Sequence, residues 1–222
     1  MLSTVSPRAA DPALRVALID AAARLIAEEG SAALSLRRLA GEVGTSTMAI
    51  YTHFGGMDEV RRAVRIEGFA RLAAHLDAVE ETDDPVADLT LLGWAYYRNA
   101  LTNPNLYRVM FMDVPNAPRA GIGIETFVHL VLGVERCIQA GRFAPADAVE
   151  LAVQVWSTEH GIVTLYLGGF LSEEQAFATF AATGGHLLLG FGDDRAALLQ
   201  SFTTALGRAG DLGSTGLGAA LD

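Results

Sequence analysis

The chain has 222 residues, of which 51% are hydrophobic and 19% charged, and its formal net charge is −10 at pH 7. This length and apolar content suffice for one sizeable core and a smaller one, which favours a two-domain, all-helical protein. No window of about twenty residues is apolar enough to span a membrane, and the N-terminal MLSTVSPRAADPA lacks a signal-peptide core, so we expect a cytoplasmic protein.

The first predicted element is a helix over residues 14–30. Its apolar residues recur at helical spacing, and Gly30 stands where a helix end needs a residue that tolerates a positive φ. One face of this helix should therefore be buried. The residues on that face are Leu14, Leu18, Ala22, Leu25 and Ile26.

Residues 35–54, SLRRLAGEVGTSTMAIYTHF, predict two short helices around a tight turn. Ser35 and Ser46 can each cap a helix, and Gly44 can end the first one. The turn is then about three residues long, as in a helix-turn-helix motif. An ordinary helical hairpin inside a core has the same pattern, so the flanking sequence must separate the two interpretations. The residues that face inward are Leu36, Leu39, Ala40, Val43, Ile50 and Phe54.

The sequence that follows predicts a break and then a long helix. Gly55 and Gly56 interrupt the chain, and MDEV opens the helix with two acids in its first turn, Asp58 and Glu59. Negative charge at this end is favourable because the helix dipole is positive there. A compact set of helices on both sides of the turn favours the helix-turn-helix interpretation.

Residues 14–66 resemble, without a gap, the N-terminal domain of the TetR family of transcriptional regulators. The most specific part of the match is the stretch IYTHF. The resemblance implies a homodimer in which each subunit reads half of a palindromic DNA operator, and a larger helical domain that binds a small-molecule inducer.

The resemblance also implies which side chains meet DNA. Arg37 would reach bases or phosphates, and Tyr51 and His53 match positions that contact the phosphate backbone. Side chains in the first turns of the second short helix would approach base edges. The complete predicted set is Ser35, Arg37, Ser46, Thr47, Met48, Ala49, Tyr51, Thr52 and His53.

Two positions depart from the family pattern. Met57 and Thr47 stand where the family often has a lysine that pairs with phosphate, and each loss should flatten the salt dependence of binding by about one unit of slope. Arg61 or Arg62 could partly compensate. Residues 1–65 hold eight arginines against seven acids, whereas the remainder holds eight against nineteen, so the acidic pI near 4.9 belongs to the rest of the chain.

Further along, helices are predicted over residues 86–102, 105–112, 124–140 and 146–170, with a loop over 113–123. Ser172 and Gln175 have the spacing of a capping box at the start of another helix. Residues 194–206 form a possible additional helix, and the Gly-rich sequence after Arg208 predicts a flexible tail. The predicted domains are 10–60 for DNA binding, 61–208 for ligand binding and dimerisation, and 209–222 for the tail.

Residues 94–111 and 156–165 resemble the TetR C-terminal domains with a Trp, His-Gly signature, the "WHG" class. This implies a dimer interface formed by residues 146–170 and 173–191 as a four-helix bundle. An inducer pocket is expected between the middle helices. The alternative is that the same aromatic residues are ordinary core and that the histidine makes a structural hydrogen bond. The pocket candidates are Trp94, Tyr97, Phe111, Phe127, Trp156 and His160.

No pattern predicts catalysis. The five histidines are dispersed, HExxH and CxxC are absent, and the single Cys137 excludes an intrachain disulfide. We therefore expect no enzyme activity, catalytic residue, metal or cofactor. The sequence predicts a dimeric DNA-binding regulator, a repressor released from its palindromic operator by an apolar or amphipathic ligand, with no membrane partner. The alternative is a ligand-sensing or scaffold dimer that binds DNA weakly or not at all, and repression is not distinguished from activation.

Overall fold

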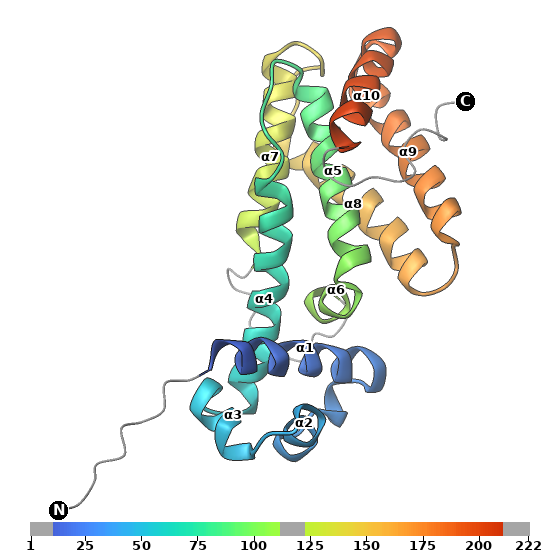
Figure 1. The fold of residues 1–222 in the computed structure, drawn as a ribbon. Helices are drawn as coiled ribbons and strands as arrows, with labels where there is room; N and C mark the ends of the chain where they lie inside the picture. Colours follow the sequence, from blue (N-terminus) through green and yellow to red (C-terminus); the bar gives the residue numbers. More distant parts are fainter. Residues whose placement is uncertain (1–10, 112–122, 211–222) are drawn as a thin grey trace, which may run out of the picture. The chain divides into compact units, whose positions relative to one another are not determined.

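The computed structural model describes residues 11–111 and 123–210, and every regular element within those ranges is a helix, as the sequence predicts (Figure 1). The bounds of the elements follow in chain order. They are α1 (Pro12–Glu29), η1 (Ser31–Ala33), α2 (Leu36–Val43), α3 (Thr47–Phe54), α4 (Met57–Asp77), α5 (Pro85–Thr102), α6 (Pro104–Phe111), α7 (Ile124–Gln139), α8 (Ala148–Leu167), α9 (Glu173–Gly190) and α10 (Arg195–Ala209).

These helices form two compact units. In the described ranges the first unit comprises residues 11–70 and 103–111, and the second comprises residues 71–102 and 123–210. The boundary predicted between residues 60 and 61 thus differs from the division by contacts, which falls within α4 after Ala70. The predicted second domain, residues 61–208, also included α6, but this helix packs extensively on α1 and belongs to the first unit.

The first unit has its own core, built from one face of each of its helices. Leu18 and Leu25 of α1, Leu39 of α2, Ile50 of α3 and Val60 of α4 have no exposed surface. The α6 residues Leu106 and Val109 complete this cluster. Because α2 and α3 each contribute an apolar face to the same core, packing against that core fixes the turn between them.

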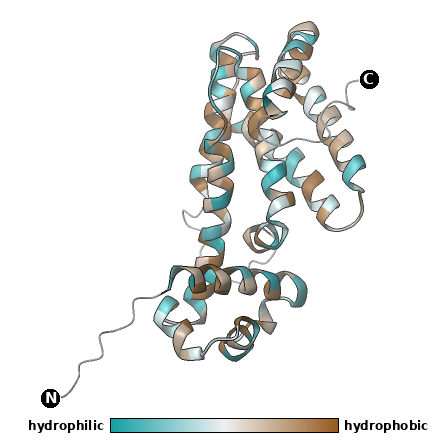
Figure 2. Cartoon of the chain, in the orientation of Figure 1, coloured by the Kyte–Doolittle hydropathy of each residue, from teal (hydrophilic) through white to brown (hydrophobic). Residues whose placement is uncertain are grey.

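The second unit is organised around α5, which packs against α7, α8 and α10, while α8 packs against α9. Most α5 positions are buried, and they include the polar residues Asp88 and Asn99. Polar and apolar colours alternate along α4 (Figure 2). The core of the unit is made by Val86, Leu89, Val134, Cys137, Phe143, Leu151, Ala152, Val155, Leu188, Phe191 and Leu198.

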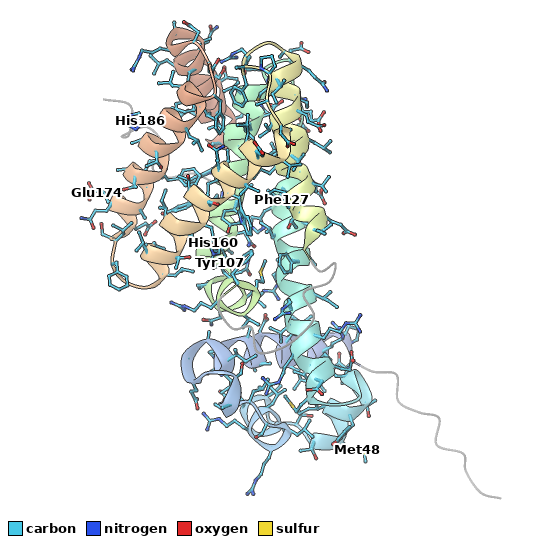
Figure 3. The ribbon with its side chains drawn as sticks, turned by 180° about the vertical axis from the view of Figure 1, so that it is seen from behind. Met48, Tyr107, Phe127, His160, Glu174 and His186 are labelled. Carbon is cyan, nitrogen blue, oxygen red and sulfur yellow. The ribbon has the colours of Figure 1, made fainter. Side chains whose placement is uncertain are left out.

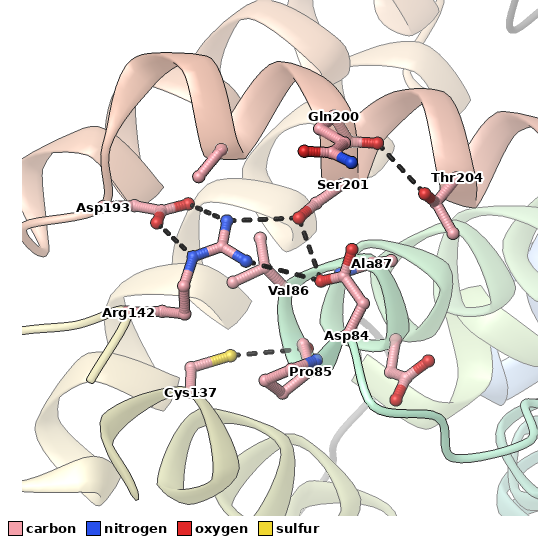
Figure 4. A network of polar contacts seen from close by, with 12 residues as sticks. Asp84, Pro85, Val86, Ala87, Cys137, Arg142, Asp193, Gln200, Ser201 and Thr204 are labelled. Atoms are coloured by element: carbon pink, nitrogen blue, oxygen red, sulfur yellow. Dashed lines mark hydrogen bonds and ion pairs between the residues drawn. The ribbon is translucent and has the colours of Figure 1, made fainter. Parts of the chain in front are cut away.

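The last helix, α10, extends the one predicted over residues 194–206, and buried ion pairs attach it. Arg208 near its end bonds to Asp88, which is only 2% exposed. Arg142 donates to both oxygens of Asp193, at 2.6 and 2.8 Å, and to Ser201 on α10 (Figure 4). The predicted tail lies almost wholly outside the described residues, and so does most of the predicted loop over 113–123.

Several helix ends differ from prediction by one to three residues, and α8 ends at Leu167 rather than at residue 170. α8 begins at Ala148 rather than residue 146 because the Asp147 carboxylate accepts from the amides of Val149 and Glu150. α6 begins at Pro104, since the first helical position needs no amide donor. The capping box of Ser172 and Gln175 is confirmed.

None of the helices within residues 11–111 and 123–210 combines the length and the apolar character needed to cross a bilayer.

Candidate DNA-binding surface and ligand cavity

The turn between α2 and α3 is built from local caps. Ser35 Oγ accepts from the Arg38 amide at 3.3 Å, and Ser46 Oγ accepts from the Ala49 amide at 3.1 Å. Gly44 ends α2 with φ +71°, a conformation that side chains with a Cβ rarely adopt. The two helices and the short turn therefore have the predicted helix-turn-helix form.

The two faces of α3 have opposite environments. Ile50 is fully buried, whereas Met48 is 70% and Tyr51 49% exposed. Thr52 is also exposed, and its hydroxyl donates to the Met48 carbonyl at 2.9 Å, which fixes its rotamer. Met48 lies at the outer edge of the first unit (Figure 3). Ile50 thus anchors a helix whose other side is open to a partner.

The remaining predicted contact residues lie around that open side. Ser46 and Thr47 are exposed at the start of α3, and Ala49 and His53 are half-buried along it. Ser35 is exposed at the start of α2. The structure therefore brings the nine predicted DNA contacts onto the two helices of one motif, and their role in binding stays a prediction.

The arginines of the first unit divide into two groups. Arg38 pairs with Glu29 at 2.9 Å, and Arg61 Nη2 donates to the Ser31 carbonyl at 3.0 Å. Within the described residues, exposed Arg37 has neither a hydrogen bond nor an ion pair. Arg62 makes only a loose contact with Glu59, at 4.0 Å. Arg37 and Arg62 are thus available to an anionic partner, whereas Arg38 and Arg61 already hold parts of the unit together.

The second unit contains a cavity of about 80 Å³ between α5, α8, α9 and α10. Its wall is mostly aliphatic and aromatic, which is typical of a small-molecule site. The lining residues are Leu89, Thr90, Trp94, Val155, Thr158, Glu159, Ile162, Phe177, Phe180, Ala181, Thr183, Gly184, Leu187, Leu188, Phe202 and Leu206.

The polar groups of this wall differ in how they are satisfied. The hydroxyls of Thr90, Thr158 and Thr183 donate to carbonyls of their own helices at 2.6–2.9 Å. In contrast, the indole N–H of Trp94 is buried without a hydrogen-bond partner in the described structure. A donor in this position is available to a ligand.

Among the described residues of the cavity wall, Glu159 is the one ionisable residue. No hydrogen bond or ion pair joins its carboxyl to the described residues, and burial raises its pKa to about 8. A Cβ at Gly93 would clash with Glu159 Oε1, so the glycine lets the carboxyl rest against α5. At neutral pH this carboxyl is therefore mostly protonated.

The six pocket candidates do not gather around one cavity. Trp94 lines the cavity described above, and Tyr97 stacks on Trp94 at a centroid distance of 5.6 Å. Phe127 and His160 each contact the ring of Trp156, with centroids 5.9 and 5.7 Å away, and none of these three side chains lines the cavity. Figure 3 labels Phe127 and His160.

His160 and the sixth candidate, Phe111, already have structural partners. The Tyr96 hydroxyl lies 2.9 Å from His160 Nδ1, and burial lowers the pKa of the imidazole. Phe111 belongs to the first unit, where it packs on Tyr107 and Phe69. Neither side chain lines the cavity of the second unit.

The sequence analysis did not select Glu159 or the phenylalanines 177, 180 and 202. A signal was present for Glu159, because it continues the apolar stripe of Val155 and Ile162 along α8 and is an acid at a position facing the core. The phenylalanines carried no such signal, since α9 and α10 meet α5 only in the folded chain.

In residues 11–111 and 123–210, no three His, Cys, Asp or Glu side chains gather as they would around a metal ion.

Comparison with family models finds two matches along the chain. Residues 18–64 match the model described as bacterial regulatory proteins, tetR family. Residues 89–187 match the model described as tetracyclin repressor-like, C-terminal domain. The first match contains the α2–α3 turn, and the second contains most of the cavity wall.

Individual relatives agree with these models. YobS of Bacillus subtilis (strain 168), an uncharacterized HTH-type transcriptional regulator, is 27% identical over 149 residues, which cover 67% of this chain and 76% of YobS. A protein with unknown function from Rhodococcus sp. RHA1 is 29% identical, with a TM-score of 0.70 over 84% of this chain and 99% of its own. The TetR family transcriptional regulator PfmR from Thermus thermophilus shares the fold, with a TM-score of 0.66, 22% identity, and coverage of 77% and 96%.

Proposed function

This chain belongs to the TetR family of transcriptional regulators, which are DNA-binding dimers and in general not enzymes, and we propose that it is a repressor released from a palindromic operator by a small apolar or amphipathic ligand. The observation that carries the proposal is the open face of α3. Met48, Tyr51 and Thr52 are exposed on it, while Ile50 is buried behind them.

The chemistry of that face suits a DNA groove. Hydroxyls of Thr47, Tyr51 and Thr52 can meet base edges and phosphates, and Met48 offers an apolar contact to a thymine methyl group. Arg37 adds a positive charge and forms no ion pair with any Asp or Glu in the described residues. Because few cations are present, we expect hydrogen bonds and dimerisation to supply much of the affinity, and the salt dependence to be shallow.

We place the dimer interface on α8 and α9. The predicted segments correspond to these two helices, which pack against each other within the second unit. Large apolar side chains are exposed on or next to α8, including Val149, Val153, Leu165 and Phe170. A second copy would remove this surface from water, and two helices from each subunit would form a four-helix bundle.

A ligand can release the protein from DNA only if it binds one conformation of the dimer more tightly than another. The cavity of the second unit supports this part of the proposal because its wall is mostly apolar, comes from four helices, and includes the Glu159 carboxyl and the buried indole N–H of Trp94, which has no partner in the described structure. In some conformations of the dimer, the spacing of the two DNA-binding units does not match the spacing of the operator half-sites. A ligand that binds such a conformation more tightly lowers operator affinity, at most by the ratio of its affinities for the two conformations.

The test uses the purified full-length chain and DNA from upstream of its own coding sequence. We expect binding to one palindromic fragment, with an affinity that falls as salt rises. R37A should weaken binding about tenfold and reduce the salt slope by about one. Y51F, which removes only a hydroxyl, should weaken it by a similar factor without changing the slope.

R195A is the matched control, because exposed Arg195 has the same charge and lies at the start of α10. It should leave operator binding unchanged. Equal effects of R37A and R195A would indicate nonspecific attraction, and a failure to bind any upstream fragment specifically across a range of salt would contradict the proposal.

A further inference from the structure

The acid inside the cavity has an unusual position for a charged residue. Glu159 is half-buried on α8, and no other lining residue of the cavity is ionisable. The three lining threonines direct their hydroxyl protons to backbone carbonyls, so they do not donate to it. Placing an unpaired carboxyl in an apolar wall costs stability unless a partner offsets that cost.

Aromatic rings surround the same space. Trp94 of α5, Phe177 and Phe180 of α9, and Phe202 of α10 all line it. Trp94 and Phe177 meet edge to face, with centroids 5.5 Å apart. The faces of such rings carry partial negative charge and attract organic cations, with tryptophan the strongest.

These features discriminate between classes of ligand. An anion would find no arginine or histidine among the described lining residues to pair with, and it would repel Glu159 once that carboxyl is ionised. A neutral apolar ligand would fill the space but leave the carboxyl unpaired. A positively charged group with apolar substituents satisfies the acid and the rings at once.

We infer that this cavity binds a lipophilic organic cation, such as a substituted ammonium, with its charge against the Glu159 carboxylate and its apolar substituents against Trp94 and the neighbouring phenylalanines. The inference rests on the proposed function in taking this cavity as the effector site. It adds the chemical class of the effector and the residue that selects it.

The test compares two molecules of the same shape and different charge. Tetramethylammonium is the cation, and neopentane, in which carbon replaces the charged nitrogen, is the neutral isostere; both are compact, as a cavity of about 80 Å³ requires. Binding to the full-length chain is measured at pH 8 by calorimetry and by tryptophan fluorescence. We expect the cation to bind at least about tenfold more tightly, as expected for a charge-assisted contact.

Two variants locate the contact. E159Q keeps the size of the side chain and removes its charge, and should weaken cation binding at least about tenfold while changing neopentane binding less than about threefold. E125Q makes the same change on an exposed residue of α7, outside the cavity wall and the proposed dimer interface, and should have no effect. Melting curves of both variants confirm that they are folded. Absence of cation binding, equal affinity for the isostere, or cation binding unchanged by E159Q would overturn the inference.

Operator release is measured separately, so that the two proposals can fail separately. If the cation binds through Glu159 but leaves the operator complex intact, ligand release fails and the inference about the cavity stands. If a neutral or anionic ligand such as 4-phenylbutanoate releases DNA while the cation does not bind, the inference fails and the proposed function stands.

Discussion

Arg61 on α4 donates through Nη2 to the carbonyl oxygen of Ser31, 3.0 Å away, and also reaches the Leu34 carbonyl at 3.5 Å. These carbonyls belong to η1 and the residue after it, directly before the cap of α2. Arg61 therefore supports the start of the helix-turn-helix motif. Arg62 is the better candidate to compensate for the missing lysine at Met57, because its side chain is 63% exposed.

This difference predicts opposite phenotypes for two neighbouring arginines. R61A should lower the free energy of unfolding by about 1–3 kcal/mol, because it removes the charge-assisted hydrogen bonds to the Ser31 and Leu34 carbonyls at a partly buried position. R62A should change stability by less than about 0.5 kcal/mol but weaken operator binding and reduce its salt slope by about one. Denaturant titration and binding at several salt concentrations measure the two effects. Equal loss of stability in both variants would refute the assignment.

The two faces of α3 predict a second contrast. I50A should cost about 2–5 kcal/mol of stability, because Ile50 is fully buried and its removal leaves a cavity. M48A should cost less than about 0.5 kcal/mol, since Met48 is 70% exposed, but should alter the preference for operator sequence. Thermal unfolding and binding to operators with single base changes check this. A destabilised M48A would show that Met48 has a packing role.

A third prediction concerns the attachment of α10. Burial raises the pKa of Asp88, but hydrogen bonds from Thr82, Arg208 and Arg136 outweigh it and hold the pKa below its ordinary value. D88N leaves both guanidinium groups without this anion, so it should cost about 2–4 kcal/mol near neutral pH. D83N, a change at an exposed neighbour, is the control and should be near neutral.

The same lowered pKa fixes the sign of the pH dependence. The stabilisation by Asp88 is fully present above the unfolded pKa of about 3.9, and it is lost as pH falls through the lower pKa of the folded protein. Wild-type stability should therefore approach that of D88N at acid pH. A constant difference between the two proteins down to about pH 2 would contradict this account.

Glu159 predicts a pH dependence of the opposite sign. Its pKa is about 8 in the folded protein, because burial disfavours the carboxylate, and near the ordinary value of about 4.3 when unfolded. The unfolded chain thus loses its proton first, and the free energy of unfolding should fall as pH rises from about 5 to about 8. In E159Q this fall in the free energy of unfolding between about pH 5 and pH 8 should be absent. Parallel stability curves for E159Q and wild type over that range would show that the carboxyl is not buried as described.

Cation binding should follow the same ionisation. Only the carboxylate pairs with the ligand, so affinity for tetramethylammonium should rise by up to about tenfold per pH unit below pH 8 and level off above it. The other helices of the cavity contribute no ionisable lining residue, so a single proton should account for the slope. In E159Q the affinity should be independent of pH, and a remaining slope would assign the titration to another group.

Much of the first unit follows from local sequence. Ser35, Gly44 and Ser46 determine where α2 and α3 begin and end, because capping depends on atoms within a few residues. The alternation of buried Ile50 with exposed neighbours also follows from helical spacing, and so does the all-helical class. The residues expected to meet DNA come instead from the family resemblance of this one short continuous segment, and their role stays a prediction.

The cavity wall and the role of Arg61 depend on contacts between segments that are distant in the sequence. The cavity takes its wall from α5, α8, α9 and α10, so no local pattern distinguishes Phe180 or Phe202 from ordinary core residues. Arg61 and Arg62 are equivalent in sequence, but only Arg61 reaches the carbonyls 27–30 residues earlier in the chain. Secondary structure and caps depend on neighbouring residues, whereas the partner of a buried charge or ring depends on which helices the core brings together.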